Sequence, residues 1–261
     1  MILRRVMAHV KAQNWFAVTI DFVIVVVGVF IGIQFSNWNE ARGERAQALE
    51  DRQRLIADLN SNQADLVNRL RYFRAVQGHA QATLAALAKS DTGSDQDFLV
   101  HAYQASQVLL ADPKRVTYDE ILATGRLTRL GDPQLRDAVG NFYVTMASAL
   151  PFLNNVPEYR ENLRRTMPGA IQITIRERCP ERYDYLRDGT LLNSLPARCD
   201  PGLDPDAAAA AAPRVRRMTG ATEDLNRLID DLNVKMEVIG SALDQVRALR
   251  VKLATADAQT S

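Results

Sequence analysis

Residues 15–35 read WFAVTIDFVIVVVGVFIGIQF, an apolar run interrupted only by one threonine, one aspartate and one glutamine. These 21 residues match the ~20 residues that a helix needs to span a bilayer. The only two tryptophans, Trp15 and Trp38, would lie about 35 Å apart in a helix, one at each membrane interface. A buried core helix would seldom carry so unbroken a β-branched stretch. The run therefore predicts a transmembrane helix.

The flanks of this run bear on processing and orientation. No small-x-small cleavage site follows it, because residues 36–40 read SNWNE, so we expect an uncleaved anchor. Lys and Arg residues stand on both sides, and their number does not decide the orientation. A short basic head is typical of a tail that stays in the cytoplasm. We therefore expect residues 1–14 in the cytoplasm, residues 15–35 in the membrane and residues 36–261 outside it.

Asp21, Gly28 and Gly32 fall on one face of the expected helix. Gly28 and Gly32 form a GxxxG pattern, in which missing side chains let two helix backbones approach closely, and an ionisable residue within a span is a candidate functional residue. Two interpretations stay open: a face that pairs with a second copy or another envelope protein, and a chance spacing with Asp21 near enough to the interface to be protonated or hydrated. A proton relay is disfavoured, since one helix offers no second polar partner.

Beyond the anchor, the sequence predicts two long amphipathic helices. Apolar residues recur three, four or seven positions apart in one stretch that ends near Lys89 and in another that begins near Arg214. Low aromatic content and abundant Ala, Leu and Arg also favour helices. Two such stripes can be buried only against each other and against shorter helices between them. The predicted fold class is all-α, an elongated antiparallel bundle behind one transmembrane helix.

Shorter helices are expected between the two long ones. Ser94 is expected to cap a helix that reaches Leu110, beyond which Asp112-Pro113 ends it. Thr117 and Glu120 have the spacing of a capping box, and Gly125 is placed to close that short helix. The remaining expectations are a helix from Asp132-Pro133 to just before Pro151 and one from Pro157 to about Arg165.

Residues 151–205 form an irregular, proline-rich insertion in this outline. Ile171, Ile173 and Ile175 alternate as in a strand, although a helix also fits. Cys179 and Cys199 would pair as a disulfide if the domain faces an oxidising compartment, and would otherwise be two thiols. An alanine-rich helical turn follows at Asp204-Pro205 and is expected to be interrupted by Pro213.

The outer end of the anchor resembles a known family. Gln34, Asn37, Trp38, Asn39 and Glu40 match the Gln-x-x-Asn-Trp-Asn-Glu signature of a widespread family of bacterial membrane-anchored proteins of unknown function, and Asp21 occupies its early acidic position. The stretch 117–143, with Tyr118, Gly125, Leu135-Arg136 and Asn141-Phe142-Tyr143, is similar to a second pattern of that family. The resemblance implies a bacterial inner membrane and a periplasmic domain, and supplies no activity.

The signature residues also have a direct physical interpretation. Trp38 would lie at the level of the lipid headgroups, and the amides of Gln34, Asn37 and Asn39 would lie where the helix leaves the hydrocarbon. Such amides can hydrogen-bond to headgroups or to another helix. Simple interfacial anchoring is the preferred interpretation, and a dedicated partner site is the alternative.

No residue set predicts catalysis, cofactor binding or metal binding. The net charge of +1, from 32 Lys+Arg and 31 Asp+Glu, gives no basic excess for nucleic acid. No phosphate-binding or nucleophile-elbow motif occurs, and His9, His79 and His101 are scattered along the sequence. Asp91-Thr92-Gly93 is interpreted as a polar turn rather than a protease triplet. Asp200, Asp204 and Asp206 lack calcium-loop spacing and are assigned to turns and caps.

Two functions from different classes follow. The first is a structural or interaction protein of the cell envelope, without catalytic activity, whose partners are the lipid bilayer and either a second copy or another envelope protein. The second is a ligand-sensing periplasmic bundle that signals through a partner. We expect the first, because the chain shows no second span and no cytoplasmic output domain.

Overall fold

The structure is a computed structural model that describes residues 15–89 and 93–260, and for residues 15–19, 21 and 258–260 it describes the course of the backbone alone. The described chain is all-α, as predicted, apart from one two-stranded sheet. It divides into two compact units, Met1–Glu50 and Asp51–Ser261, here called unit 1 and unit 2. The expected cytoplasmic head at residues 1–14 lies outside the described residues.

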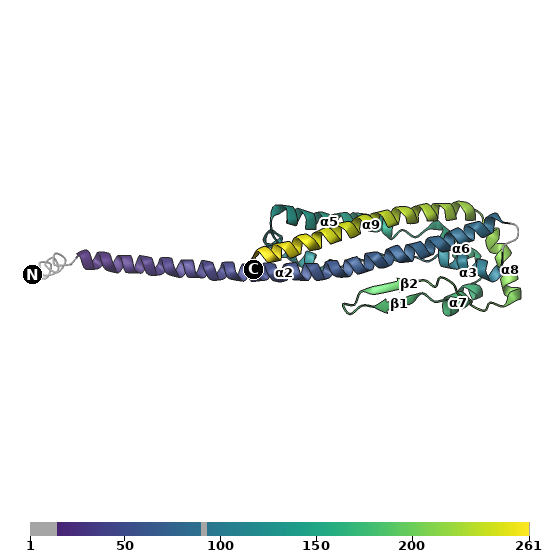
Figure 1. The fold of residues 1–261 in the computed structure, drawn as a ribbon, viewed down its shortest axis with the longest axis horizontal. Helices are drawn as coiled ribbons and strands as arrows, with labels where there is room; N and C mark the ends of the chain where they lie inside the picture. The colour runs from purple at the N-terminus through teal and green to yellow at the C-terminus, as the bar shows by residue number, and fades with distance from the viewer. Residues whose placement is uncertain (1–14, 90–92, 261) are drawn as a thin grey trace, which may run out of the picture. The chain divides into compact units, whose positions relative to one another are not determined.

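Helix α2 runs from Trp15 to Ala88 and contributes to both units (Figure 1). Its length follows from the sequence, because no proline occurs before Pro113 and so nothing interrupts the backbone hydrogen bonds over these residues. The expected end near Lys89 is confirmed. Among the described residues, α2 is the one helix long and apolar enough, by length and composition, to cross a membrane.

Within unit 2, helix α9 (Ala221–Thr260) lies antiparallel to the adjoining part of α2, as predicted (Figure 1). Three side-chain contacts mark this direction, because the α9 residue number falls as the α2 number rises. They are Arg52 Nε to Asp257 Oδ1 at 2.5 Å, Arg250 to Gln63 at 2.5 Å, and Gln77 to Asn233 at 2.6 Å.

The facing stripes of the two long helices form the centre of the unit 2 core. Burial of such stripes removes apolar surface from water, which is the main driving force for packing the bundle. The buried members are Leu55, Leu59, Leu66, Phe73 and Val76 on α2, and Leu225, Leu228, Leu232, Ile239, Leu243, Val246 and Leu253 on α9.

Shorter elements complete unit 2. In chain order they are α3 (Asp95–Ala105), α4 (Val116–Ala123), the 3-10 helix η1 (Arg126–Arg129), α5 (Pro133–Leu153), α6 (Glu158–Thr166), α7 (Gly169–Arg178), β1 (Arg182–Tyr185), β2 (Leu191–Ser194) and α8 (Pro205–Arg216). Helix α5 packs along α9, and α3 packs against α8 and α6.

Several of the predicted helix ends are confirmed. Ser94 caps α3 and accepts a hydrogen bond from the Asp97 amide, and Asp132 caps α5 in the same way through the Leu135 amide. Gly125 has a φ of 68°, in the left-handed region that favours glycine, and it separates α4 from η1. Local sequence rules therefore fix these three boundaries.

Four other helix boundaries were predicted wrongly. Helix α3 ends at Ala105 rather than Leu110, where the Ser106 hydroxyl donates to the Tyr103 carbonyl at 2.6 Å. Helix α5 passes through Pro151 and helix α8 through Pro213. Each proline removes one hydrogen bond close to the end of its helix, where packing keeps the last turn in place. Consequently the second long helix begins at Ala221, not near Arg214.

The capping box at Thr117 and Glu120 is also contradicted. Thr117 lies inside the first turn of α4. The N-cap residue is Arg115, and its side chain makes no capping hydrogen bond. The Thr117 amide instead donates to Asp58 Oδ2 of α2 at 3.1 Å. Glu120 turns away to accept hydrogen bonds from Arg54 and Arg126. Tertiary contacts replace the local motif.

Residues 151–205 are more regular than their prolines indicate. Ile171 and Ile175 are buried on one face of α7, whereas Ile173 is exposed, so the helical alternative holds and the strand does not. The antiparallel hairpin of β1 and β2 was not predicted. Cys179 and Cys199 form the disulfide, with Cα atoms 5.7 Å apart.

Candidate functional site

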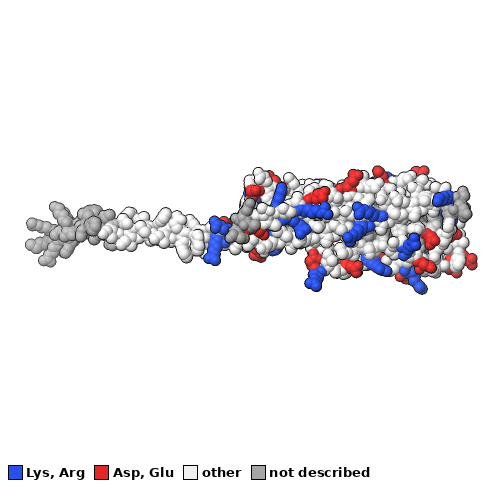
Figure 2. Space-filling view, in the orientation of Figure 1, with Lys and Arg blue, Asp and Glu red and all other residues white. Residues whose placement is uncertain are grey.

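Unit 1 exposes the apolar part of α2. Every described residue from Phe22 to Glu40 is exposed, and Phe22 is 69% accessible. From Phe22 to Phe35 this stretch contains no Lys, Arg, Asp or Glu, and Figure 2 correspondingly shows only white atoms between the grey residues at the N-terminal end and the first blue side chains. An apolar surface of this extent marks contact with lipid or with another protein. Unit 1 is therefore the first candidate functional surface.

Gly28 and Gly32 lie on one face of this exposed stretch, four residues apart. A Cβ atom built on either glycine meets nothing within 4 Å. Contacts within the described chain therefore give no reason for glycine at these positions, whereas close approach of another helix would. The third residue of the proposed contact face, Asp21, has a side chain outside the described residues.

The signature residues Gln34, Asn37, Trp38, Asn39 and Glu40 are also exposed on α2. The ring centroids of Phe35 and Trp38 lie 5.9 Å apart, and the Arg42 guanidinium lies 5.9 Å from the centroid of the Trp38 ring. An aromatic pair beside a cation is an arrangement suited to a membrane interface, where apolar rings and phosphate groups meet.

A second candidate site lies in unit 2, where α2 and α3 bring two histidines together. The Nδ1 atoms of His79 and His101 are 2.8 Å apart and their rings are tilted by 46°. Sequence reasoning missed this pair because the residues are scattered along the chain. One signal was present: His79 occupies a position of the apolar α2 stripe, between Val76 and Thr83, which are both buried.

Burial keeps this pair uncharged. The pKa of His79 is lowered to about 4, chiefly by burial and also by the neighbouring His101, while a hydrogen bond to the Pro196 backbone opposes the shift. Burial also lowers the pKa of His101, against the opposing effect of Asp97. One Nδ1 atom of the pair donates to the other, and the tautomers of the two rings decide which one donates.

A cavity of about 520 Å³ opens beside the histidine pair. Its wall carries carboxylates and a guanidinium. The polar and sulfur-containing residues that line it are His79, Asp97, His101, Arg198, Cys199 and Asp200. The carboxylates do not converge on the histidines: among the described residues, no group of three or more His, Cys, Asp or Glu side chains could hold a metal ion.

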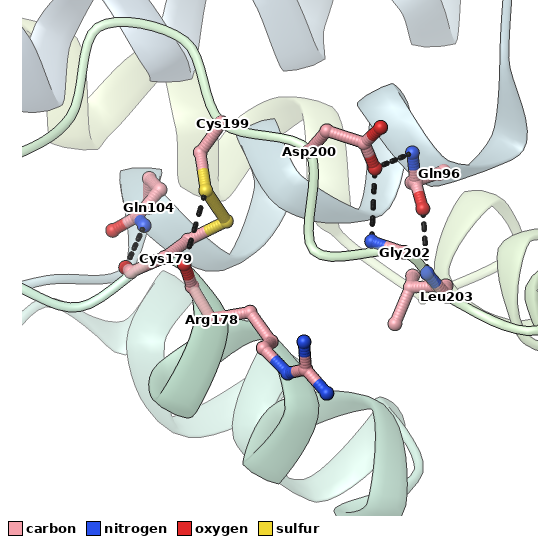
Figure 3. The surroundings of a disulfide bond; sticks show 8 residues. All are labelled: Gln96, Gln104, Arg178, Cys179, Cys199, Asp200, Gly202 and Leu203. Carbon is pink, nitrogen blue, oxygen red and sulfur yellow. Dashed lines mark hydrogen bonds between the residues drawn. A yellow bond between two sulfur atoms is a disulfide. The ribbon is translucent and has the colours of Figure 1, made fainter.

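Cys199, which lines this cavity, is held by its disulfide with Cys179 (Figure 3). Cys179 is buried at the end of α7, and its carbonyl accepts from Gln104 Nε2 of α3 at 3.1 Å. Next to Cys199, Asp200 accepts hydrogen bonds from Gln96 at 2.9 Å and from the Gly202 amide at 2.8 Å (Figure 3). Asp200 is therefore a loop-ordering residue, in agreement with its assignment to a turn.

The other two aspartates of that group have similarly local positions. Asp204 is the N-cap of α8 and accepts from the Ala207 amide at 2.9 Å, and Asp206 lies in the first turn. The triplet Asp91-Thr92-Gly93 is described only at Gly93, since residues 90–92 lie outside the described residues.

The second stretch of the family resemblance, residues 117–143, forms part of the unit 2 core. Tyr118 stacks on Tyr143 with ring centroids 4.3 Å apart, and Leu135 and Phe142 are buried. Nearby, hydrogen bonds from Arg54 and Arg126 lower the pKa of Glu120 to about 2. These contacts account for the pattern as packing and ion pairing within the domain.

Comparison of the chain with family models, with curated proteins and with solved structures gives no match. The resemblance of residues 32–40 and 117–143 to the bacterial family therefore rests on those residues alone.

Proposed function

We propose that the protein is a membrane-anchored interaction module of the bacterial cell envelope, without catalytic activity. In this proposal residues 15–35 cross the inner membrane and unit 2 lies in the periplasm. One observation carries it: every residue from Phe22 to Phe35 is exposed in unit 1, and all of them except Gln34 are apolar. Burial in lipid would remove this apolar surface from water, at roughly 25 cal/mol per Å².

Two observations support a periplasmic unit 2. The chain contains two cysteines, and both belong to the disulfide. Disulfides persist in oxidising compartments and are rare in the bacterial cytoplasm. The short basic head before residue 15 favours the same orientation. Two reporters fused after Ser261, one active only in the periplasm and one active only in the cytoplasm, test the orientation: activity of the first supports the proposal, and activity of the second overturns it.

The anchor face supports the choice of partner. Gly28 and Gly32 leave open space on the same face of α2, so a second helix can approach its backbone closely. The proposed partner on this face is a second copy of the chain or another envelope protein. The anchor then acts both as a tether and as a contact surface.

Crosslinking and pull-down of the full chain from detergent extracts test this face. The variant Gly28→Ile/Gly32→Ile fills it, and we expect it to lose the crosslinked complex. Gly43→Ile is the matched control, because Gly43 is another α2 glycine with nothing within 4 Å of an added Cβ. Retention of every complex by the double variant would show that the face is not a contact surface.

The cavity beside His79 and His101 supports a second candidate function, a ligand-sensing ectodomain. Its wall presents charges of both signs, with Asp97 and Arg198 among them, which suits a small zwitterion such as an amino acid. Thermal shift assays with amino acids test it on the full chain in micelles. A thermal shift that Arg198→Ala removes would favour sensing. The absence of any shift would reject sensing and keep the interaction module as the proposed function.

A further inference from the structure

The hairpin of β1 and β2 has one closed edge and one open edge. On the β2 side, the Asn68 amide of α2, with its oxygen and nitrogen placed to match their partners, donates to the Asn193 carbonyl at 2.9 Å and accepts from the Asn193 amide at 3.0 Å. All four residues of β1 are exposed, and Tyr185 is 72% accessible. Within the described residues, β1 pairs with β2 and with no other strand.

The register shows which backbone groups face outward from β1. Tyr183 lies opposite Asn193, whose amide and carbonyl face Asn68 rather than β1. The Leu186 amide donates to the Thr190 carbonyl at 2.9 Å, so the even-numbered residues of β1 exchange hydrogen bonds with β2. The amides and carbonyls of Tyr183 and Tyr185 therefore point away from the hairpin.

Contacts within the hairpin and with other elements of unit 2 hold the hairpin in place. At its base, Asn193 donates to Glu181, the residue before β1, at 2.8 Å, and Tyr183 donates to the same carboxylate at 3.1 Å. In the turn, the Asp188 carbonyl accepts from Lys114 at 2.9 Å. The open edge is thus presented by a fixed element, which lowers the entropic cost of pairing with another strand.

The sequence of β1, Arg-Tyr-Asp-Tyr, is complementary to itself in one antiparallel register. The outward amides and carbonyls belong to odd-numbered residues. In a symmetric antiparallel pair, each odd-numbered residue of one copy must therefore lie opposite an odd-numbered residue of the other copy. An axis at Tyr183 places Arg182 opposite Asp184 of a second copy, twice. An axis at Asp184 opposes two aspartates, and one at Arg182 opposes two arginines. Opposite charges directly across strands stabilise a pair, and like charges destabilise it.

Arg182 and Asp184 are available for this pairing. Both residues are exposed, and within residues 15–89 and 93–260 neither forms an ion pair. In the register centred on Tyr183 they would form the closer, non-hydrogen-bonded pairs of the new ladder, with Cα atoms about 4.5 Å apart.

We propose that β1 of a second copy of this chain adds to β1 as an antiparallel strand, with the two-fold axis at Tyr183. The two hairpins then form one four-stranded sheet that covers both open edges. This contact deepens the proposed interaction function by naming a second copy as the partner, but it uses a surface of unit 2 and does not depend on the Gly28 and Gly32 face.

Charge reversal tests the proposed pairing of Arg182 with Asp184 of the second copy. We expect Arg182→Asp alone and Asp184→Arg alone to weaken dimerisation of the full chain in micelles about tenfold, because each opposes like charges twice. The double reversal Arg182→Asp/Asp184→Arg restores the opposite charges and is expected to return to within about twofold of wild type. Equal weakening in the double variant, with the fold intact by circular dichroism, would overturn the register.

Cysteine crosslinking tests the axis. Residues at position 183 of two copies would have Cα atoms about 5.5 Å apart, within reach of a disulfide, so Tyr183→Cys is expected to crosslink. Tyr185→Cys is the matched control on the same strand, because each copy of residue 185 would oppose residue 181. Equal crosslinking of both variants, or none of Tyr183→Cys, would overturn the proposal.

The same experiment separates this contact from the anchor face. Tyr183→Cys is expected to crosslink also in the Gly28→Ile/Gly32→Ile background if the hairpin contact is independent. Loss of the anchor-dependent complex together with retained crosslinking at position 183 would support both contacts. Retained anchor-dependent complexes without crosslinking at 183 would reject the hairpin contact and leave the proposed function standing.

Discussion

The Nδ1 atoms of His79 and His101 lie 2.8 Å apart, and this distance leaves room for one proton between them. One ring donates this proton and the other accepts it. The pair is then neutral, and a further proton would break its single hydrogen bond and place charge beside a buried ring. The geometry therefore makes the stability of unit 2 sensitive to pH.

We predict that the protein loses stability as the pH falls from about 6.5 to about 4. The pKa of His79 is about 4 when folded and 6.5 in the unfolded chain, so the unfolded state binds more protons in this window. Integrated over it, the loss is about 3 kcal/mol. Urea unfolding at several pH values, compared with His79→Leu, measures it. The same pH slope in both proteins would rule out the histidine as its source.

Reduction of the disulfide should destabilise the same region. Cys179 and Cys199 are 20 residues apart in sequence, and opening a loop of that size costs about 3 kcal/mol in the chain-entropy treatment. We expect dithiothreitol to lower the free energy of unfolding of wild type by about this amount. The variant Cys179→Ala/Cys199→Ala should not respond to the reductant. Two titratable thiols in unreduced, denatured protein would show that the pair is not oxidised.

The start of α4 offers a test of which contact caps it. Asp58 Oδ2 accepts from the Thr117 amide at 3.1 Å, so Asp58→Ala should cost about 1 kcal/mol, as for other lost helix caps. Thr117→Val keeps the shape and removes only the hydroxyl, so it should leave the stability nearly unchanged. Thermal unfolding of the two variants shows which contact caps the helix. A larger effect of Thr117→Val would restore the capping box that the sequence indicates.

Sequence periodicity predicts the large features of unit 2 well, because the long helices bury continuous stripes. Leu59 of α2 and Leu243 of α9 are each buried where their spacing placed them. Local signals fail where a distant side chain competes for the same group. Thr117 is one case, since Asp58 lies 59 residues away in the sequence, and no local rule could reveal that contact.

The candidate sites divide in the same way. The exposed surface of Gly28 and Gly32 could be predicted from sequence, because it depends on composition and helical spacing alone. The histidine pair could not, because His79 and His101 are separated by 22 residues and meet only when α3 packs on α2. The hairpin also escaped prediction: the residues of β1, Arg-Tyr-Asp-Tyr, alternate in type but are all exposed, so no buried face marks this short strand.

Tryptophan fluorescence tests the depth of the anchor. Trp15→Phe leaves Trp38 as the single tryptophan. Trp38 is exposed on α2, with the Arg42 guanidinium 5.9 Å from its ring, and the proposed topology places both at the headgroups. In vesicles we expect Trp38 emission at shorter wavelength than in water, with stronger quenching by lipids brominated near the headgroup than by lipids brominated near the chain ends.

The charge of Arg42 and the length of the apolar run together determine the depth expected for Trp38. A ring pulled toward the bilayer centre would take the Arg42 cation with it, and a charge there is costly. Moving Trp38 fully into water would instead draw Ile31 and Phe35 out of the hydrocarbon. We therefore expect Arg42→Leu to shift the quenching profile toward the chain ends. An unquenched, water-like Trp38 in vesicles would contradict a membrane position for this part of α2.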